Sequence, residues 1–158
     1  MKKQIGIACL YTLITAVLLG VVYPLVVTGL AKAAFRNKAD GQLIVRNGEV
    51  IGSSLIGQPF TGPGYFHSRP SAAGTGYDAS ASSGSNLAPT SKALIDRVHA
   101  SVSAETDGTP VPVDLVTASG SGLDPDISPA AALYQITRVS RERKVPEETL
   151  RQLVMSHI

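Results

Sequence analysis

The sequence predicts an α+β fold, in which one N-terminal transmembrane helix is followed by a single small mixed α/β domain with about three helices and a short sheet. Two observations support this class. A long uncharged apolar run opens the chain, and the remainder combines a hairpin signal with three segments of helical periodicity. We therefore divide the 158 residues into an N-terminal segment 1–4, a transmembrane helix 5–31, a linker 32–42 and a domain 43–158.

The apolar run extends from Ile5 to Ala31 and contains no charged residue. At about 1.5 Å per residue, a helix of this length exceeds the roughly 30 Å hydrocarbon core of a bilayer. A cleaved signal peptide has a shorter apolar region of about 7–15 residues. A lipoprotein anchor requires a cysteine after the run, whereas Cys9 lies near its start. The run therefore predicts a retained membrane helix. Basic residues flank it at both ends, so charge alone does not predict its orientation.

Small or thin residues recur at every fourth position of this helix. Such a row lets a second helix approach closely in lipid and predicts a packing surface for a partner, although small residues are also common by chance in membrane helices. Pro24 predicts a kink or a loosened turn, because proline has no N–H to donate. The row consists of Ala8, Thr12, Ala16, Gly20, Pro24 and Thr28.

Charge and composition exclude several classes of protein. Residues 1–38 carry a net charge of +5 and residues 39–158 a net charge of −3, so the domain lacks the surplus of cations that a nucleic-acid partner requires. Hydrophobic residues make up 44% of the chain and charged residues 16%, which excludes a disordered polyelectrolyte. The single cysteine and the three widely spaced histidines predict no disulfide and no metal site. Because the sequence has neither a phosphate-binding loop nor a serine-nucleophile elbow, we predict no catalytic residue.

The domain is expected to open with a hairpin, because Asn47-Gly48 lies between the apolar residues of 43–45 and 50–51. Of the 40 residues from Gly52 to Ser91, 23 are Gly, Ser, Pro or Thr, a composition typical of a flexible linker. Four of the chain's eight aromatic residues also lie there, and disordered linkers are depleted in aromatic residues. We therefore predict an ordered irregular segment held by its aromatic side chains.

Three helices are predicted in the rest of the domain. The first begins after Ser91, the second at the capping pair Ser128-Pro129, and the third at Pro146. Between the first two, residues 113–117 predict a strand. The residues expected to face inward on the third helix are Leu150, Leu153 and Val154.

Two polar motifs precede the second predicted helix. Asp124 and Asp126 flank Pro125 and could perform acid–base chemistry or bind a cation, but such a pair more often shapes a turn. The preceding Ser119-Gly120-Ser121-Gly122 could present N–H groups to an anion, but a plain turn explains it as well. From the residues alone, the chain is a single-pass anchor that carries a small domain without an assignable active site.

Six blocks of sequence carry a resemblance to a known family. They are Gly52–Gln58, Tyr65–Ala72, Tyr77–Ala79, Ala81–Thr90, Val116–Pro129, and Ala131–Gln135 with Arg138-Val139. Together with the N-terminal helix they span nearly the whole chain, and they occur in the family's order. The chain resembles the C subunit of the Kdp potassium-transporting P-type ATPase. Where this chain has Asp126, Ser83 and Ala88, the resemblance leads us to expect His, Gly and Gly.

The resemblance implies a non-catalytic accessory subunit of an ATP-driven, high-affinity potassium import complex in the bacterial cytoplasmic (inner) membrane. It implies three partners, which are a channel-like subunit that binds potassium, a P-type subunit that hydrolyses ATP and a very small membrane subunit. It also implies a cytoplasmic N-terminus at residues 1–4 and an extracytoplasmic domain at residues 43–158. ATP and magnesium are then handled by the hydrolysing partner, and no cofactor is expected on this chain.

The role of such a subunit is open at this stage. It could support assembly, cap the outer mouth of the channel-like subunit, or act as a catalytic chaperone that raises ATP affinity through a nucleotide contact at Gln135. An extracytoplasmic domain, however, cannot meet cytoplasmic ATP. The alternatives are a membrane-anchored extracytoplasmic binding module that uses the aromatic residues of 60–77, or a membrane-anchored extracytoplasmic hydrolase that uses Asp124, Asp126 or a nearby serine. The candidate partner contacts are Tyr65, Phe66, Arg69, Asn86, Ser119, Ser121, Asp124 and Asp126.

Overall fold

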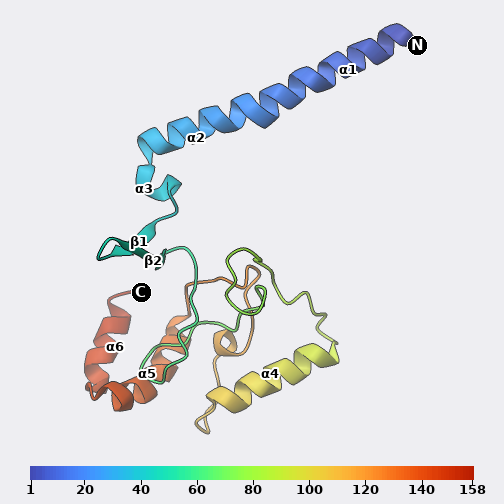
Figure 1. Cartoon of the computed structure of the whole chain (residues 1–158). Helices are drawn as coiled ribbons and strands as arrows, with labels where there is room; N and C mark the ends of the chain where they lie inside the picture. The colour runs from blue at the N-terminus through green and yellow to red at the C-terminus, as the bar shows by residue number, and fades with distance from the viewer. The chain divides into compact units, whose positions relative to one another are not determined.

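The computed structural model describes residues 1–158, which form two compact units, Met1–Ser53 and Ser54–Ile158. The first unit contains a long apolar helix, a short helix and a hairpin, and the second contains the other helices and most of the irregular chain (Figure 1). Helices combined with a short two-stranded sheet confirm the predicted α+β class.

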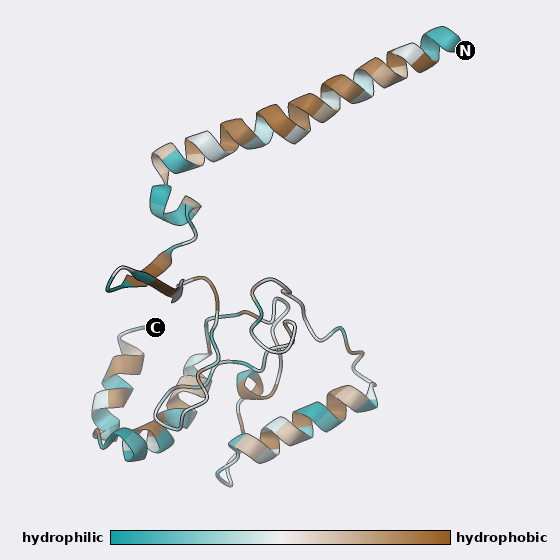
Figure 2. Ribbon diagram, in the orientation of Figure 1, coloured by the Kyte–Doolittle hydropathy of each residue, from teal (hydrophilic) through white to brown (hydrophobic).

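A helix of 33 residues, Lys2–Ala34, is long and apolar enough to cross a membrane. Figure 2 shows hydrophobic residues along most of its length. Because Pro24 cannot donate to the carbonyl four residues back, the helix widens just before it, and the Tyr23 N–H bonds the Leu18 carbonyl five residues back. The expected loosened turn is thus confirmed. The parts of the helix are α1 (Lys2–Val17), a π-helical turn (Leu18–Val22) and α2 (Tyr23–Ala34).

A short helix, α3 (Arg36–Ala39), leads to an antiparallel hairpin of β1 (Leu43–Arg46) and β2 (Glu49–Ser53). The two turn residues, Asn47 and Gly48, have φ angles of 53° and 84°. A two-residue turn of type I′ requires positive φ at both positions. The predicted hairpin is therefore confirmed.

Three helices of the second unit confirm the predicted ones. The Ser128 hydroxyl accepts the Ala131 N–H at 3.2 Å and caps the second of them, with Pro129 at its first position. Two acidic residues lie in the first turn of the third, at the favourable end of the helix dipole. The helices are α4 (Lys92–Glu105), α5 (Pro129–Arg143) and α6 (Glu147–Met155).

The predicted strand at residues 113–117 is wrong. A single 3₁₀ turn, Val113–Leu115, occupies this place, and the only sheet is the hairpin. Pro110 and Pro112 lack the N–H groups that strand pairing uses. The adjacent residues Leu115 and Val116 are both buried, whereas neighbouring residues of a strand point to opposite faces.

Residues 54–91 form no helix or strand. Aromatic side chains hold this segment, as predicted. The Tyr65 ring lies 5.6 Å from the Phe60 ring, and the Arg143 guanidinium lies over Tyr65 at 4.9 Å from the ring centroid. Phe66 packs against the hydrophobic core. The segment is thus a fixed part of the second unit.

The core of the second unit lies between α5 and α6 and is small. Its buried residues are Ile136, Val139 and Leu150, with Val154 packed against them. Leu153 was expected to face inward and does not, because 51% of its surface is exposed. It lies about 100° around the helix from Val154, so the short α6 turns Leu153 away from α5.

Candidate functional site

Gln135 of α5 has a buried polar side chain, with 1% of its surface exposed. Its amide oxygen accepts the His67 N–H at 2.6 Å, and its amide nitrogen donates to the carbonyls of His67 (3.1 Å) and Ala131 (3.2 Å). The Arg138 guanidinium donates to the same amide oxygen. All the donors and acceptors of this amide are therefore used within the chain, and no polar atom of Gln135 is left for a nucleotide.

Two arginines of α5 bind the same irregular segment. Arg138 donates to the carbonyls of Pro63 (2.6 Å) and Tyr65 (3.0 Å), and Arg143 donates to the carbonyl of Gly64. Burial lowers the pKa of the Arg138 guanidinium from its ordinary value, and a nearby carboxylate partly offsets this shift. The segment is thus attached to α5 through three consecutive carbonyl groups.

A further polar link joins the irregular segment to the end of α4. The His67 ring places Nδ1 3.0 Å from a Glu105 carboxylate oxygen and Nε2 3.3 Å from the Gly62 carbonyl. The Tyr134 hydroxyl of α5 donates to the Glu105 carbonyl at 3.0 Å. One histidine and one tyrosine therefore tie α4, α5 and the irregular segment together.

Arg69 lies at a crossing of loops, here named the loop junction, which comprises Gly57, residues 69–77, residues 82–84 and residues 117–124. Its guanidinium donates to the Asp124 carboxylate at 3.2 Å and to the carbonyls of Thr117 and Ala118, each at 3.4 Å. The Arg69–Asp124 ion pair is partly buried on both sides. Only a planar guanidinium presents donors in this fork, so Arg69 fixes the loop that follows the 3₁₀ turn.

Two glycines show how closely the loops approach one another in this junction. A Cβ at Gly122, where φ is +66°, would lie 2.5 Å from the Ser83 carbonyl oxygen, and a Cβ at Gly57 would lie 2.6 Å from the Asp124 carbonyl oxygen. The Ser71 hydroxyl donates to the Gly122 carbonyl at 2.6 Å. The loop junction therefore consists of closely packed backbones that are joined by polar bonds.

Turn formation accounts for the two polar motifs near Pro125. Three side chains accept backbone N–H groups two or three residues ahead: Ser119 from Gly122 (2.9 Å), Ser121 from Leu123 (3.1 Å) and Asp124 from Asp126 (3.1 Å). Such bonds favour turns over regular structure, so the turn interpretation of both motifs is confirmed. The structure shows no group of three His, Cys, Asp or Glu side chains that could hold a metal ion.

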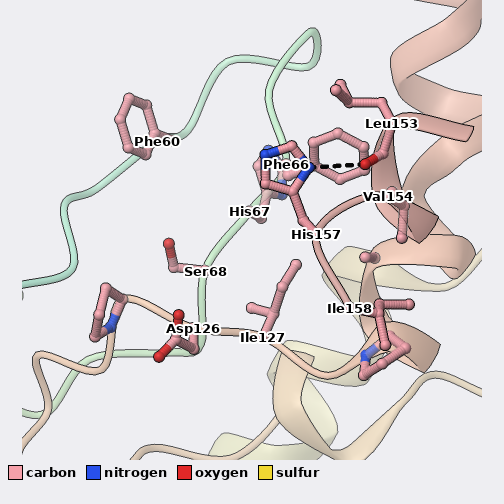
Figure 3. Close-up of a pocket in the computed structure, with 13 residues that line it drawn as sticks. Phe60, Phe66, His67, Ser68, Asp126, Ile127, Leu153, Val154, His157 and Ile158 are labelled. Carbon is pink, nitrogen blue, oxygen red and sulfur yellow. Dashed lines mark hydrogen bonds between the residues drawn. The ribbon is translucent and has the colours of Figure 1, made fainter. Parts of the chain in front are cut away.

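A groove of about 670 Å³ lies between the irregular segment, residues 125–129 and α6, and is here named the α6 groove. Figure 3 shows apolar side chains around much of it, with the Asp126 carboxylate and the His157 ring among them. The groove brings together two of the predicted contact residues, Phe66 and Asp126. The loop junction brings together four others, which are Arg69, Ser119, Ser121 and Asp124. The Tyr65 ring lies against the Arg143 guanidinium of α5, and the exposed Asn86 amide donates to the Ser83 hydroxyl at 3.4 Å.

Comparison with known proteins identifies the family. The family model described as "KdpC: K+-transporting ATPase, c chain" matches residues 5–158. The chain belongs to this family. A KdpC subunit of a potassium-transporting ATPase from Koribacter versatilis is 59% identical over 160 residues, which cover 99% of this chain and 83% of the relative. That of Acidobacterium capsulatum is 63% identical over 148 residues (93% and 80%), and that of Methylorubrum extorquens is 50% identical over 173 residues (100% and 86%).

Sequence reasoning missed three features of this KdpC chain. Arg138 and Ser71 were not singled out, although both lie inside blocks that carried the family resemblance. The third is Asp114 in the 3₁₀ turn, whose carboxylate accepts the Ser128 N–H at 2.7 Å. The Ser128 hydroxyl and this N–H hold the pKa of Asp114 below its ordinary value of 3.8. An acidic residue in a proline-bounded segment is a weak signal, because its partner lies 14 residues further along the chain.

We predict that Gln135→Leu destabilises the second unit, because it leaves the His67 N–H and carbonyl without partners. Each unsatisfied buried group costs about 1–3 kcal/mol. The melting temperature of the full chain in mild detergent, followed by circular dichroism, should fall by at least about 5 °C. The Gln135→Glu variant keeps the oxygen that accepts the His67 N–H, so its melting temperature should fall less. Gln152→Leu, on the exposed face of α6, is the matched control and should change little. Equal melting of the Gln135→Leu and Gln152→Leu variants would contradict this role of Gln135.

A second prediction concerns pH. A carboxyl group whose pKa is lowered by folding stabilises the protein above its ordinary pKa, and this stabilisation is lost as the pH falls through the folded value. The destabilisation caused by Asp114→Asn should therefore be largest above about pH 5 and shrink as the pH falls below 3.8. Melting temperatures measured across this range test it. Asp96→Asn, in an exposed pair with Lys92, is the control and should have little effect. A pH-independent effect of Asp114→Asn would refute this role.

Proposed function

We propose that this chain is a non-catalytic accessory subunit of an ATP-driven potassium import complex in the bacterial cytoplasmic membrane. Residues 1–4 are cytoplasmic, residues 5–31 span the bilayer once, residues 32–42 form a linker, and the domain 43–158 is extracytoplasmic. There the domain supports assembly of the complex and caps the outer mouth of the channel-like subunit. The observation that carries this proposal is the match to the KdpC family over residues 5–158.

The side chains that suggested chemistry support a structural role. Asp124 pairs with Arg69, and the hydroxyls of Ser119 and Ser121 shape a turn. These three side chains serve the loop junction, so none of the three is free to act as the nucleophile or base of a hydrolase. Because these bonds fix the loops, the loop junction forms a rigid surface. A rigid surface suits a role in assembly.

Gln135 makes no nucleotide contact in this role, because all the polar atoms of its amide are bonded within the chain. ATP and magnesium bind to the hydrolysing subunit. Any effect of this chain on ATP affinity then passes through the membrane helix or the other subunits. The proposed partners are the channel-like subunit, the P-type subunit and the very small membrane subunit.

The charge of the second unit fits a place at a cation entrance. Residues 54–158 contain ten acidic and eight basic residues, a net charge of −2. A mildly negative surface raises the local concentration of cations by a small factor. The unit thus favours potassium near the entrance without a binding site of its own.

Purification from native membranes tests the proposal. With an affinity tag on the full chain, a P-type ATPase, a polytopic channel-like protein and a very small membrane protein should co-purify in a fixed ratio in mild detergent. The preparation should show potassium-stimulated ATPase activity. A chain that purifies alone and monodisperse would contradict the proposal and favour the alternative of a membrane-anchored extracytoplasmic binding module.

The small-residue row of the membrane helix generates a further prediction. Nothing in this chain lies within 4 Å of a Cβ added at Gly20 or at Gly29, so leucine at either position harms only contacts with other chains. Gly29 lies nine residues from Gly20, about two and a half turns, and hence on the opposite face. Gly20→Leu should lower co-purification of the other subunits several-fold, whereas Gly29→Leu should not. An intact complex with Gly20→Leu would exclude this row as the contact.

A further inference from the structure

The α6 groove is an open apolar surface of a kind that a stable domain rarely leaves in water. Phe60 is 47% exposed and Leu153 is 51% exposed, and both line the groove with Phe66, Ile127 and Val154. The side chains come from three separate parts of the second unit (Figure 3). Polar links hold one wall, because His67 and its neighbours are bound by Gln135 and Arg138. The groove is therefore a preformed surface.

Four polar residues line the groove, namely His67, Ser68, Asp126 and His157. The His67 ring already contacts the Glu105 carboxylate and the Gly62 carbonyl. The Asp126 carboxylate belongs to none of the ion pairs of the second unit. In His157, Nδ1 lies 2.8 Å from the Leu153 carbonyl. Since a carbonyl oxygen only accepts, Nδ1 carries a hydrogen, and Nε2 is the ring nitrogen left for an occupant of the groove. Nε2 points away from Leu153 (Figure 3). The groove thus offers apolar area together with a carboxylate that has no ion-pair partner and the free edge of the His157 ring.

This combination selects the chemistry of the occupant. An apolar side chain fills the lined space, and a Lys or Arg side chain next to it supplies the donors and the positive charge that complement Asp126 and His157. Asp126 would repel an anionic headgroup. A purely apolar ligand would cover the Asp126 carboxylate without giving it a partner, which is unfavourable.

We propose that the α6 groove binds an extended extracytoplasmic segment of another subunit of the potassium-transporting complex, through an apolar anchor side chain that is followed or preceded by a Lys or Arg. This inference rests on the proposed function, because it requires that the chain assembles with other subunits. It deepens that function by placing one protein contact at Leu153 and Asp126.

Variants on one helix provide a matched test. Leu153 and Met155 are both exposed on α6, at 51% and 58%, but only Leu153 lines the groove. In complexes purified through the tagged chain, Leu153→Asp should lower the recovery of the other subunits about ten-fold, and Met155→Asp should not. Asp126→Lys should lower recovery similarly, because it sets like charges against each other, whereas Glu142→Lys on α5, outside the groove, should not. Equal recovery with Leu153→Asp and Met155→Asp would overturn the proposal.

Photo-crosslinking identifies the occupant. Benzoylphenylalanine at position 153 of the full chain in native membranes should form an adduct with another subunit, at a peptide that has an apolar residue beside a Lys or Arg. The same probe at position 155 should not. Adducts only with lipid, with a second copy of this chain or within the chain would overturn the proposal, as would no adduct in an intact complex. If the unmodified chain purifies alone, the proposed function itself fails, which distinguishes the two results.

Discussion

The second unit depends on a side-chain amide that takes the place of a neighbouring strand. Gln135 bonds both the N–H and the carbonyl of His67, as a paired strand residue would. Residues 54–91 have no sheet ladder, and buried backbone groups without partners are costly. Helix α5 meets this need with Gln135, Arg138 and Arg143, so one helix face organises the longest irregular stretch of the chain.

The loop junction extends the same principle to a second set of backbones. One guanidinium, that of Arg69, satisfies a carboxylate and two carbonyls, and glycine at positions 57 and 122 allows the chains to touch. Ser and Gly are therefore abundant in the loop junction because hydroxyls bond its backbones and glycines let them approach closely. Carboxylates and serine hydroxyls serve catalysis in many proteins, whereas here those of Asp124, Ser119 and Ser121 hold loops in place.

The parts of the fold that follow from local signals could be predicted from the sequence. Asn47-Gly48 specifies a hairpin through its own backbone preferences, and Ser128 caps a helix three residues ahead. The strand prediction at residues 113–117 was wrong because their β-branched and apolar residues are typical of a strand, whereas a strand needs a neighbour that this unit lacks. The contact between Gln135 and His67 spans 68 positions, so no local pattern announces it.

In the candidate site, too, some features could be predicted from the sequence and others could not. Two of the family blocks meet in space, because Arg69 bonds Asp124. That these residues contact a partner stays a prediction. The exposure of Leu153 depends on how the short α6 is rotated against α5, which the sequence of α6 alone does not determine. The proposed partner of the small-residue row is another chain, so a test of this row needs the assembled complex.

The thin core has a thermodynamic consequence. Eight apolar residues are buried in the chain, all of them in the second unit, while polar bonds supply much of its organisation. The heat capacity change of unfolding grows with the apolar surface exposed, and polar surface lowers it. We therefore expect a flat stability curve for the second unit, with a shallow maximum and little loss of stability on cooling. Its unfolding also responds weakly to denaturant for its length, because that response scales with the surface newly exposed.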